Sequence, residues 1–412
     1  VTVMRNGTAL YGAKGANGVI LIQTRRNKSM ATRITATASA GVTLQPKFLS
    51  VMNAGQYRGY VSELLKSTNT RNDEFKFLNT KSPSYGEYRY ETDWKDEVYH
   101  TAISQNYGIN VEGGDDVANY NLSVNYTSQA TLKYNDMDRL NIRFNTDISL
   151  LQKLDVRFDA SFSNQTRNIR SDGAPENYDE GTPTSPSFLA YAKSPFMSPY
   201  STAYNTDGTP FLTDHLNIAD ESYLSEALTY YSNYNWKLAN PVALNEYGDA
   251  PNKNHFENSM FNLAVTPKFT FNPHLSLSEH FSYNLVNTNE KLYIPVNGVP
   301  DYYVSSVNAY RENEVRSLFS KQNSVMSDTR IDWKNRYNAH DIHVFGGVRI
   351  NWENYTLNSQ LGYNTGTDKT PFISNSTKNN QLDGTNDAWN SMAWYAQAEY
   401  NYMGRYFLQA NV

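Results

Sequence analysis

The sequence predicts an all-β fold, a transmembrane antiparallel β-barrel, and three observations support this prediction. Apolar and polar residues alternate along about eleven segments, and this period of two is typical of strands. Several segments run to about eleven to thirteen residues, longer than the usual five or six, and this length suits a tilted membrane crossing. The connections alternate between tight turns and long loops, as they do in outer-membrane barrels.

Composition excludes several classes of protein. The 412 residues carry 36 basic and 41 acidic side chains, a net charge of −5, which gives no basic footprint for nucleic acid. No run of 18 apolar residues is present, so a helical membrane span is excluded, whereas strand spans are compatible with the composition. Zero cysteines exclude disulfides, thiolate metal sites and cysteine nucleophiles.

Residues 1–30 differ from the rest in their regularly spaced glycines, and they are predicted to form a separate unit with turns at these glycines. Gly12, Gly15 and Gly18 have a spacing that could suggest a phosphate-binding loop. That interpretation is weak, because no strand precedes the glycines and the apolar strand 19–22, rather than a helix, follows them.

Residues 31–412 contain the alternating segments, most of which form hairpins. The clearest hairpin joins 140–150 to 154–162 through a tight turn, with one apolar and one polar face. The predicted strands, of which 315–333 is the weakest, lie at 34–44, 107–111, 120–126, 140–150, 154–162, 261–271, 275–285, 315–333, 342–350, 394–402 and 406–410.

The connections between these strands are predicted to be long on one side of the sheet only. The long ones lie at 45–103, 165–258, 287–314 and 353–390. A soluble β-sandwich would show the same alternation within strands, but a Greek-key sandwich has no reason to alternate its loop lengths by side. Tyr and Trp near strand ends also favour a membrane barrel, because these rings sit at the headgroup level.

Within each predicted strand, the apolar residues are assigned to face lipid, and the Asn, Arg, Asp and Ser residues that alternate with them are assigned to face the lumen. Every backbone N–H and C=O in hydrocarbon needs a partner, so such a barrel must close. Eleven strands would leave two unpaired edges, and we therefore expect the sequence to be a fragment that lacks an N-terminal part and roughly half a barrel.

Several segments resemble one family. The segment Thr8–Thr24, with Tyr11, Gly12, Gly15, Asn17 and Gly18, closely resembles the end of the plug domain in SusC/RagA-like TonB-dependent transporters. Further segments that resemble the family are 91–98 (ETDWKDEV), 105–123, 240–244 (NPVAL) and 396–408. These matches extend from the first residues to the last.

The resemblance implies a barrel of 22 strands around a plug. Residues 1–30 would be the C-terminal end of the plug, with a short buried strand at 19–22, and 31–412 the first half of the barrel with long extracellular loops. The family imports oligosaccharides or oligopeptides across the Gram-negative outer membrane of Bacteroidetes, beneath a SusD-like surface lipoprotein. TonB supplies energy through a Ton box absent from this chain. The resemblance implies neither catalysis nor a cofactor, and it leaves open whether two transporters pair as a homodimer.

Candidate residues for contact with solute lie in the second long loop, which is rich in aromatic and amide side chains. Aromatic faces stack on sugar rings or apolar peptide groups, while hydroxyls and amides bind polar edges. The alternative is that these rings pack within the loop or against a lid protein. The candidates are Tyr200, Tyr204, Tyr230, Tyr231 and Trp236.

Other polar groups predict no metal site and no catalytic site. Strand alternation places His340 and His343 on opposite faces, which disfavours a shared metal. The oxygen-rich segment 383–387 lacks a complete calcium pattern and is interpreted as a polar turn. No pair of carboxylates has the fixed separation that a glycosidase needs.

Two alternative functions share these features. A secreted carbohydrate-active enzyme would also be rich in β-strands and aromatic residues, and its soluble polypeptide would cleave oligosaccharides. A surface receptor that does not transport would share the barrel and differ only in whether nutrient uptake depends on it. The sequence does not distinguish glycan from peptide cargo.

Overall fold

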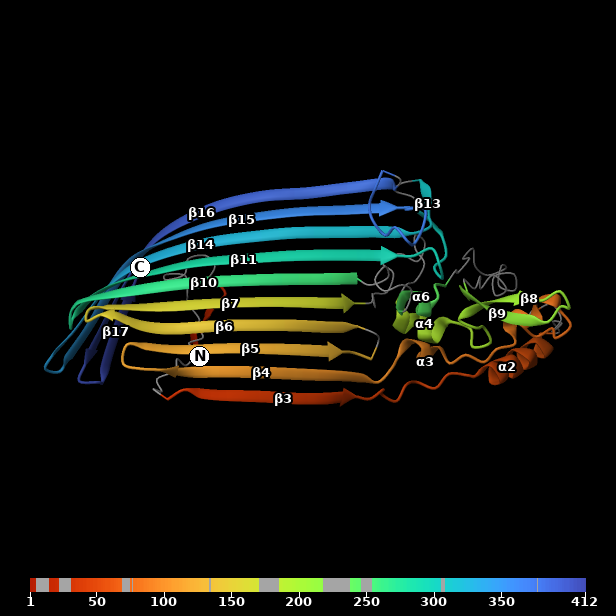
Figure 1. Ribbon diagram of the computed structural model, residues 1–412, viewed down its shortest axis with the longest axis horizontal. Helices are drawn as coiled ribbons and strands as arrows, with labels where there is room; N and C mark the ends of the chain where they lie inside the picture. The colour runs from red at the N-terminus through yellow and green to blue at the C-terminus, as the bar shows by residue number, and fades with distance from the viewer. Residues whose placement is uncertain are drawn as a thin grey trace.

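A computed structural model describes residues 1–4, 15–21, 31–68, 75, 77–132, 135–169, 185–217, 238–245, 254–304, 308–375 and 377–412. Its main feature is a single 11-stranded antiparallel sheet (Figure 1). The order of the strands in the sheet follows their order along the chain, so each strand pairs with the sheet strand that precedes it in sequence. The predicted number of strands and the all-β class are confirmed. The strands are β3 (Arg33–Thr43), β4 (Ala102–Gly114), β5 (Ala118–Ala130), β6 (Asp136–Leu151), β7 (Leu154–Ile169), β10 (Asn254–Asn272), β11 (Leu275–Ile294), β14 (Glu314–Tyr337), β15 (His340–Tyr363), β16 (Lys378–Tyr402) and β17 (Tyr406–Asn411).

Tight turns join the strands at one end of the sheet, and the helices gather beyond the other end (Figure 1). None of the helices in the described ranges is long and apolar enough to cross a membrane. The elements of the long connections are α2 (Ala54–Ser67), η3 (Pro83–Tyr88), α3 (Trp94–Val98), α4 (Pro186–Ala192), β8 (Tyr200–Tyr204), β9 (Pro210–Leu216), α6 (Pro241–Asn245), β12 (Tyr302–Val304) and β13 (Ala309–Arg311).

The later strands are longer than the alternation predicted. β14 and β15 each have 24 residues and β16 has 25, so the last two long connections shrink to 295–313 and 364–377. The segment 383–387, interpreted from sequence as a turn, lies within β16, where Asp383 pairs with Ser359. Alternation is lost here because both faces are polar, yet the ladder hydrogen bonds still satisfy the backbone.

Strand register places the two predicted parities on opposite faces of the sheet, here called the apolar face and the polar face. Ile142 pairs with both Val124 and Phe162, which pairs in turn with Phe261, so apolar residues run in rows across the strands. On the next row Asn141 accepts from Ser163 at 2.8 Å. Large side chains of the apolar face are open to the surroundings, and Ile109 is 55% exposed.

Glu279 interrupts the apolar face, a feature that the alternation does not reveal. It follows Leu277 and precedes Phe281 on the same parity of β11. Its carboxylate accepts hydrogen bonds from the hydroxyls of Ser327, at 2.6 Å, and Thr329 on the neighbouring strand. These bonds offset part of the cost of placing a carboxylate among apolar side chains.

The N-terminal unit contains β1 (Thr2–Met4) paired with β2 (Val19–Leu21). Gly18 has a φ of 98°, a conformation that favours glycine, and its N–H donates to the Gly15 carbonyl across a turn that includes Asn17. The predicted strand is confirmed but its burial is wrong, because this two-stranded sheet has no covering layer in the described residues and Ile20 is 66% exposed. Tyr11 and Gly12 lie outside the described residues.

The turn between β4 and β5 supports a prediction about pH. Asp115 accepts hydrogen bonds from the backbone N–H groups of Ala118, at 2.7 Å, and Val117, at 2.8 Å, and these bonds lower the pKa of its carboxyl. Because the pKa of Asp115 is lower in the folded state, its carboxylate stabilises the turn at pH values above the unfolded pKa of about 3.9. This contribution is lost as pH falls from there through the lowered folded-state pKa. Hydrogen exchange should show the amides of 117–118 losing protection on acidification, whereas Asp115→Asn should flatten this dependence.

Candidate functional site

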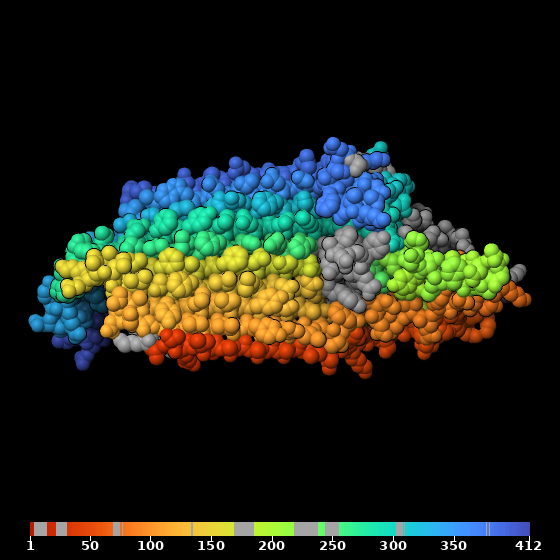
Figure 2. Space-filling model, viewed as in Figure 1, coloured from red at the N-terminus to blue at the C-terminus, as the bar shows by residue number. Residues whose placement is uncertain are grey.

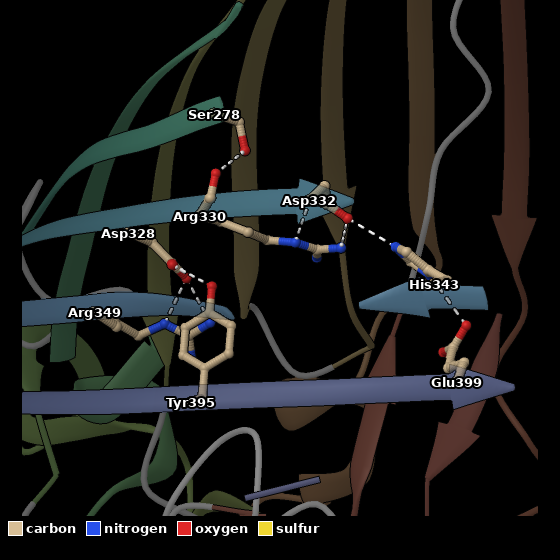
Figure 3. Close-up of polar contacts among 8 residues, drawn as sticks. All are labelled: Ser278, Asp328, Arg330, Asp332, His343, Arg349, Tyr395 and Glu399. Atoms are coloured by element: carbon tan, nitrogen blue, oxygen red, sulfur yellow. Dashed lines mark hydrogen bonds and ion pairs between the residues drawn. The ribbon is translucent and has the colours of Figure 1, made fainter. Parts of the chain in front are cut away.

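Charged side chains gather on the polar face of β14, β15 and β16, near the end with tight turns (Figure 3). Asp328 pairs with Arg349 across the β14–β15 ladder, and Arg349 Nη2 lies 2.6 Å from Asp328 Oδ2. The Tyr395 hydroxyl donates to the other carboxylate oxygen at 2.5 Å. The Tyr395 ring lies over Gly347, where an added Cβ would come within 2.6 Å of the tyrosine hydroxyl. The glycine therefore makes room for the ring.

A second group on the same face is centred on His343. Its Nε2 lies 2.8 Å from Asp332 Oδ1 and its Nδ1 lies 3.1 Å from Glu399 Oε2. Arg330 Nε lies 2.7 Å from Asp332 Oδ2, so Asp332 is shared between this guanidinium and the imidazole of His343. The group can hold three strands in register and present fixed charge, and no group of metal-binding residues occurs in the described part of the chain.

His340 lies on the opposite face from His343, as the alternation predicted. Its Nδ1 is 2.7 Å from the Tyr400 hydroxyl. The two histidines therefore share no ligand.

Asp328 supports a prediction about stability. Replacing Asp328 by alanine leaves Arg349 and Tyr395 without their shared acceptor and should destabilise the sheet by about 1.5–3 kcal/mol, the range for hydrogen bonds to charged groups. Reversible unfolding of the full-length protein in lipid measures this loss. Asp328→Asn, which keeps an acceptor oxygen, should lose less. Equal midpoints for Asp328→Ala and the unchanged protein would contradict the role of Asp328.

At the opposite end, the first and second long connections share one aromatic core. Phe77 stacks on Phe196 with ring centroids 4.7 Å apart and planes 1° apart. Trp94 is 3% exposed, and its Nε1 donates to the Ser194 carbonyl at 3.0 Å. Thr92 N donates to the Pro195 carbonyl at 2.7 Å. These contacts join segments about a hundred residues apart, and Figure 2 shows the two connections side by side.

The segment 240–244, singled out by resemblance, forms the centre of a second core. Asn240 is fully buried, and its Nδ2 donates to the carbonyls of Pro199, at 2.7 Å, and Asn217, at 3.1 Å. Its N–H donates to the Gly298 carbonyl, which links the third long connection. Gly298 has a φ of 79°, and a Cβ there would lie 2.5 Å from that of Ala243, so glycine is required.

The fourth long connection contributes Asp368. Its carboxylate accepts from the Tyr293 hydroxyl at 2.7 Å and from the backbone N–H groups of Val296, at 2.9 Å, and Asn297, at 3.1 Å. The described parts of the four long connections therefore form one packed assembly beyond the sheet, here called the loop assembly. Neither Asn240 nor Asp368 was predicted as a structural centre, because their partners are distant in sequence.

The predicted solute-contact residues are only partly described. Tyr200 and Tyr204 lie at the two ends of β8 and are 37% and 40% exposed. Tyr204 packs over Gly86, where an added Cβ would lie 2.8 Å from the tyrosine hydroxyl. Burial, and to a smaller extent the charge of nearby Glu87, raises the pKa of Tyr204. Packing within the loops therefore covers part of the Tyr204 ring. Tyr230, Tyr231 and Trp236 lie outside the described residues.

The single antiparallel sheet, with tight turns at one end and the loop assembly at the other, defines a class of fold, that of antiparallel β-barrels. A search with protein-family models found none that matches the chain. The chain is 26% identical over 290 residues to the TonB-dependent receptor SusC of Bacteroides thetaiotaomicron, covering 67% of the chain and 25% of that protein. It is 25% identical over 205 residues to the TonB-dependent receptor P3 of Formosa agariphila, covering 50% of the chain and 18% of that protein.

A solved structure has the same fold. The structure of the RagAB peptide transporter matches 98% of this chain and 44% of that chain, with a TM-score of 0.66 and 16% identity. The chain spans a quarter or less of the length of these two curated relatives. The resemblance to SusC/RagA-like TonB-dependent transporters is thus confirmed, and the eleven-stranded sheet is the counterpart of part of such a barrel.

Proposed function

We propose that the chain is part of a TonB-dependent importer of oligosaccharides or oligopeptides in the Gram-negative outer membrane. The sheet supports this proposal most directly. Large side chains of its apolar face are exposed, whereas side chains of its polar face form hydrogen bonds and ion pairs with one another. Such a sheet suits lipid on one side and a water-filled lumen on the other. The relatives named as TonB-dependent receptors point in the same direction and away from catalysis.

The proposal assigns a role to each region. Residues 1–30 are the end of the plug, 31–412 the first half of the barrel, and the loop assembly is the extracellular surface. Tyr200 and Tyr204 are candidates for contact with solute or with a SusD-like lipoprotein, which closes the barrel from outside. TonB supplies the energy at the periplasmic side in this proposal.

Deletion of the gene tests the proposal. Growth on one polymeric nutrient should be lost and restored by the full-length gene, and the transporter should require detergent for extraction and co-purify with a lipoprotein. Unchanged growth on every polymeric nutrient, with surface binding lost, would favour a receptor that does not transport. Cleavage of oligosaccharides by the detergent-free polypeptide would favour an enzyme.

A further inference from the structure

Two tryptophans mark the borders of the apolar face on β14 and β15. Trp333 lies near the tight turn that ends β14, and Trp352 of β15 pairs with Val325, which precedes Trp333 by eight residues. Eight residues span about 27 Å along a strand, and about 21 Å across a membrane at a tilt of about 40°. This height is close to the apolar band of about 25 Å in outer-membrane barrels, whose rims carry aromatic girdles. In the proposed orientation, Trp352 therefore lies at the outer border of the membrane.

The strands β11, β14 and β15 continue beyond this border, and the same side of the sheet becomes polar there. The next row pairs Asn323 with Asn354. The row after it pairs Lys321 with Asn287 of β11 and with Thr356 of β15. Together with one residue of the following row, these residues are here called the amide patch: Asn287, Lys321, Asn323, Asn354, Thr356 and Asn358.

Lys321 is the charged centre of the amide patch. It is exposed and lies four residues beyond Val325 on β14, which places it about 13 Å further along the strand and about 10 Å above the outer border of the apolar face. The neighbouring positions on this side of β11, β14 and β15 carry uncharged residues. On the same side of the described sheet, the nearest carboxylate belongs to Glu257 of β10, which pairs with Asn289 and lies two strands from Lys321. The ammonium is therefore placed to bind an external anion.

The chemistry of the amide patch matches a phosphorylated glycolipid. An ammonium binds phosphate, and an asparagine side chain both donates and accepts, as sugar hydroxyls require. A phosphorylated glycolipid presents acyl chains, then phosphates and then sugars, in the order in which this surface presents apolar residues, a cation and amides. A phospholipid would leave the amides without sugars. A second copy of the chain, docked symmetrically through the centre of the patch, would bring one Lys321 against the other.

We propose that the amide patch binds lipopolysaccharide, the glycolipid of the outer leaflet, with Lys321 on a phosphate of the lipid anchor and the asparagines on the sugars. The patch continues the apolar face along the same strands, so one lipid molecule would contact them with both its acyl chains and its headgroup. This inference rests on the proposed membrane location. It goes beyond import, because it concerns the outer wall of the barrel rather than the lumen.

Native mass spectrometry of the purified full-length transporter in detergent tests the inference. The probe is lipid A that carries its phosphates and the first acidic sugars of the core. Lys321→Gln removes the cation and should weaken binding of this glycolipid about tenfold. Lys334→Gln is the matched control, because Lys334 is an exposed lysine of the same strand near the tight turn. Heat-modifiable mobility on gels verifies that each variant is folded.

A second probe, phosphatidylglycerol, separates the sugars from the phosphate. This lipid is anionic and has no core sugars. Asn354→Leu removes one amide of the patch and should weaken binding of the glycolipid about threefold, the effect of one net hydrogen bond. The same variant should leave the affinity for phosphatidylglycerol unchanged.

Three outcomes would overturn the inference. Equal glycolipid affinity in the folded Lys321→Gln and Lys334→Gln variants would show that Lys321 binds no phosphate. Equal weakening of both lipids by Asn354→Leu would show that the amides bind no sugar. Loss of a transporter dimer in Lys321→Gln, with glycolipid affinity unchanged, would assign the patch to a second copy. Each outcome leaves the import proposal intact, whereas failure of the deletion test with glycolipid binding retained would overturn import alone.

Discussion

Replacing Trp94 by alanine is expected to loosen the loop assembly by about 3–5 kcal/mol, the usual cost of deleting a buried tryptophan. The side chain is 3% exposed and packs in the core with Phe196 and Tyr88, and its Nε1 donates to the Ser194 carbonyl. The substitution removes both the packing and this bond between two connections. Hydrogen exchange of the full-length protein should show faster exchange in 90–98 and 190–197, while exchange in the sheet stays unchanged.

Two variants separate packing from hydrogen bonding at this position. Trp94→Phe keeps most of the buried ring and loses the donor, so about 1 kcal/mol should be lost. Tyr60→Ala, on the exposed side of α2, should change local stability by no more than about 0.5 kcal/mol. Exchange rates in the loop assembly that stay the same in Trp94→Ala would show that this core does not hold the connections together.

In the proposed membrane orientation, lysine at Ile142 or Phe158 is expected to destabilise the protein by about 2–4 kcal/mol, because a cation would face hydrocarbon near the midplane. Both residues lie on the apolar face, on neighbouring strands of the sheet. Unfolding of the full-length protein in lipid vesicles by denaturant measures the loss. This result would establish which face the membrane covers.

The matched controls are lysines at Asn141 and Ser161. Asn141 is adjacent to Ile142 on β6, Ser161 lies on β7 with Phe158, and both control residues are on the polar face. These substitutions should be mild, since the cation would lie in a polar, hydrated environment. Equal losses at the apolar and polar positions would contradict the assigned facing. A larger loss at the polar positions would reverse it.

The alternation of apolar residues predicted the sheet better than it predicted the strand ends. A period of two is set by the pleat, and it is visible wherever the two faces meet different surroundings. This holds at Ile142 and Phe158. It fails at 383–387, where both faces are polar and only the pairing of Asp383 with Ser359 shows a strand.

The candidate site was predicted less well than the fold. Tyr200 and Tyr204 were chosen for their chemistry, and the structure places Tyr204 partly against Gly86. A cavity beside Lys95 and Met52 was not predicted, although the family-like segment 91–98 pointed to this region. Its walls come from two connections, and sequence reasoning has no means of bringing such distant segments together.

The sequence by itself determined the class of sheet, the order of its strands and the side on which the long connections lie. Local physics suffices for these features, because side-chain alternation and turn residues act over a few neighbouring positions. Only the tertiary structure decided that His343 bridges Asp332 and Glu399, that Asn240 joins the second and third long connections and that Lys95 borders a cavity. Each of these depends on contacts between residues far apart in the chain, which form only when the strands and loops have packed.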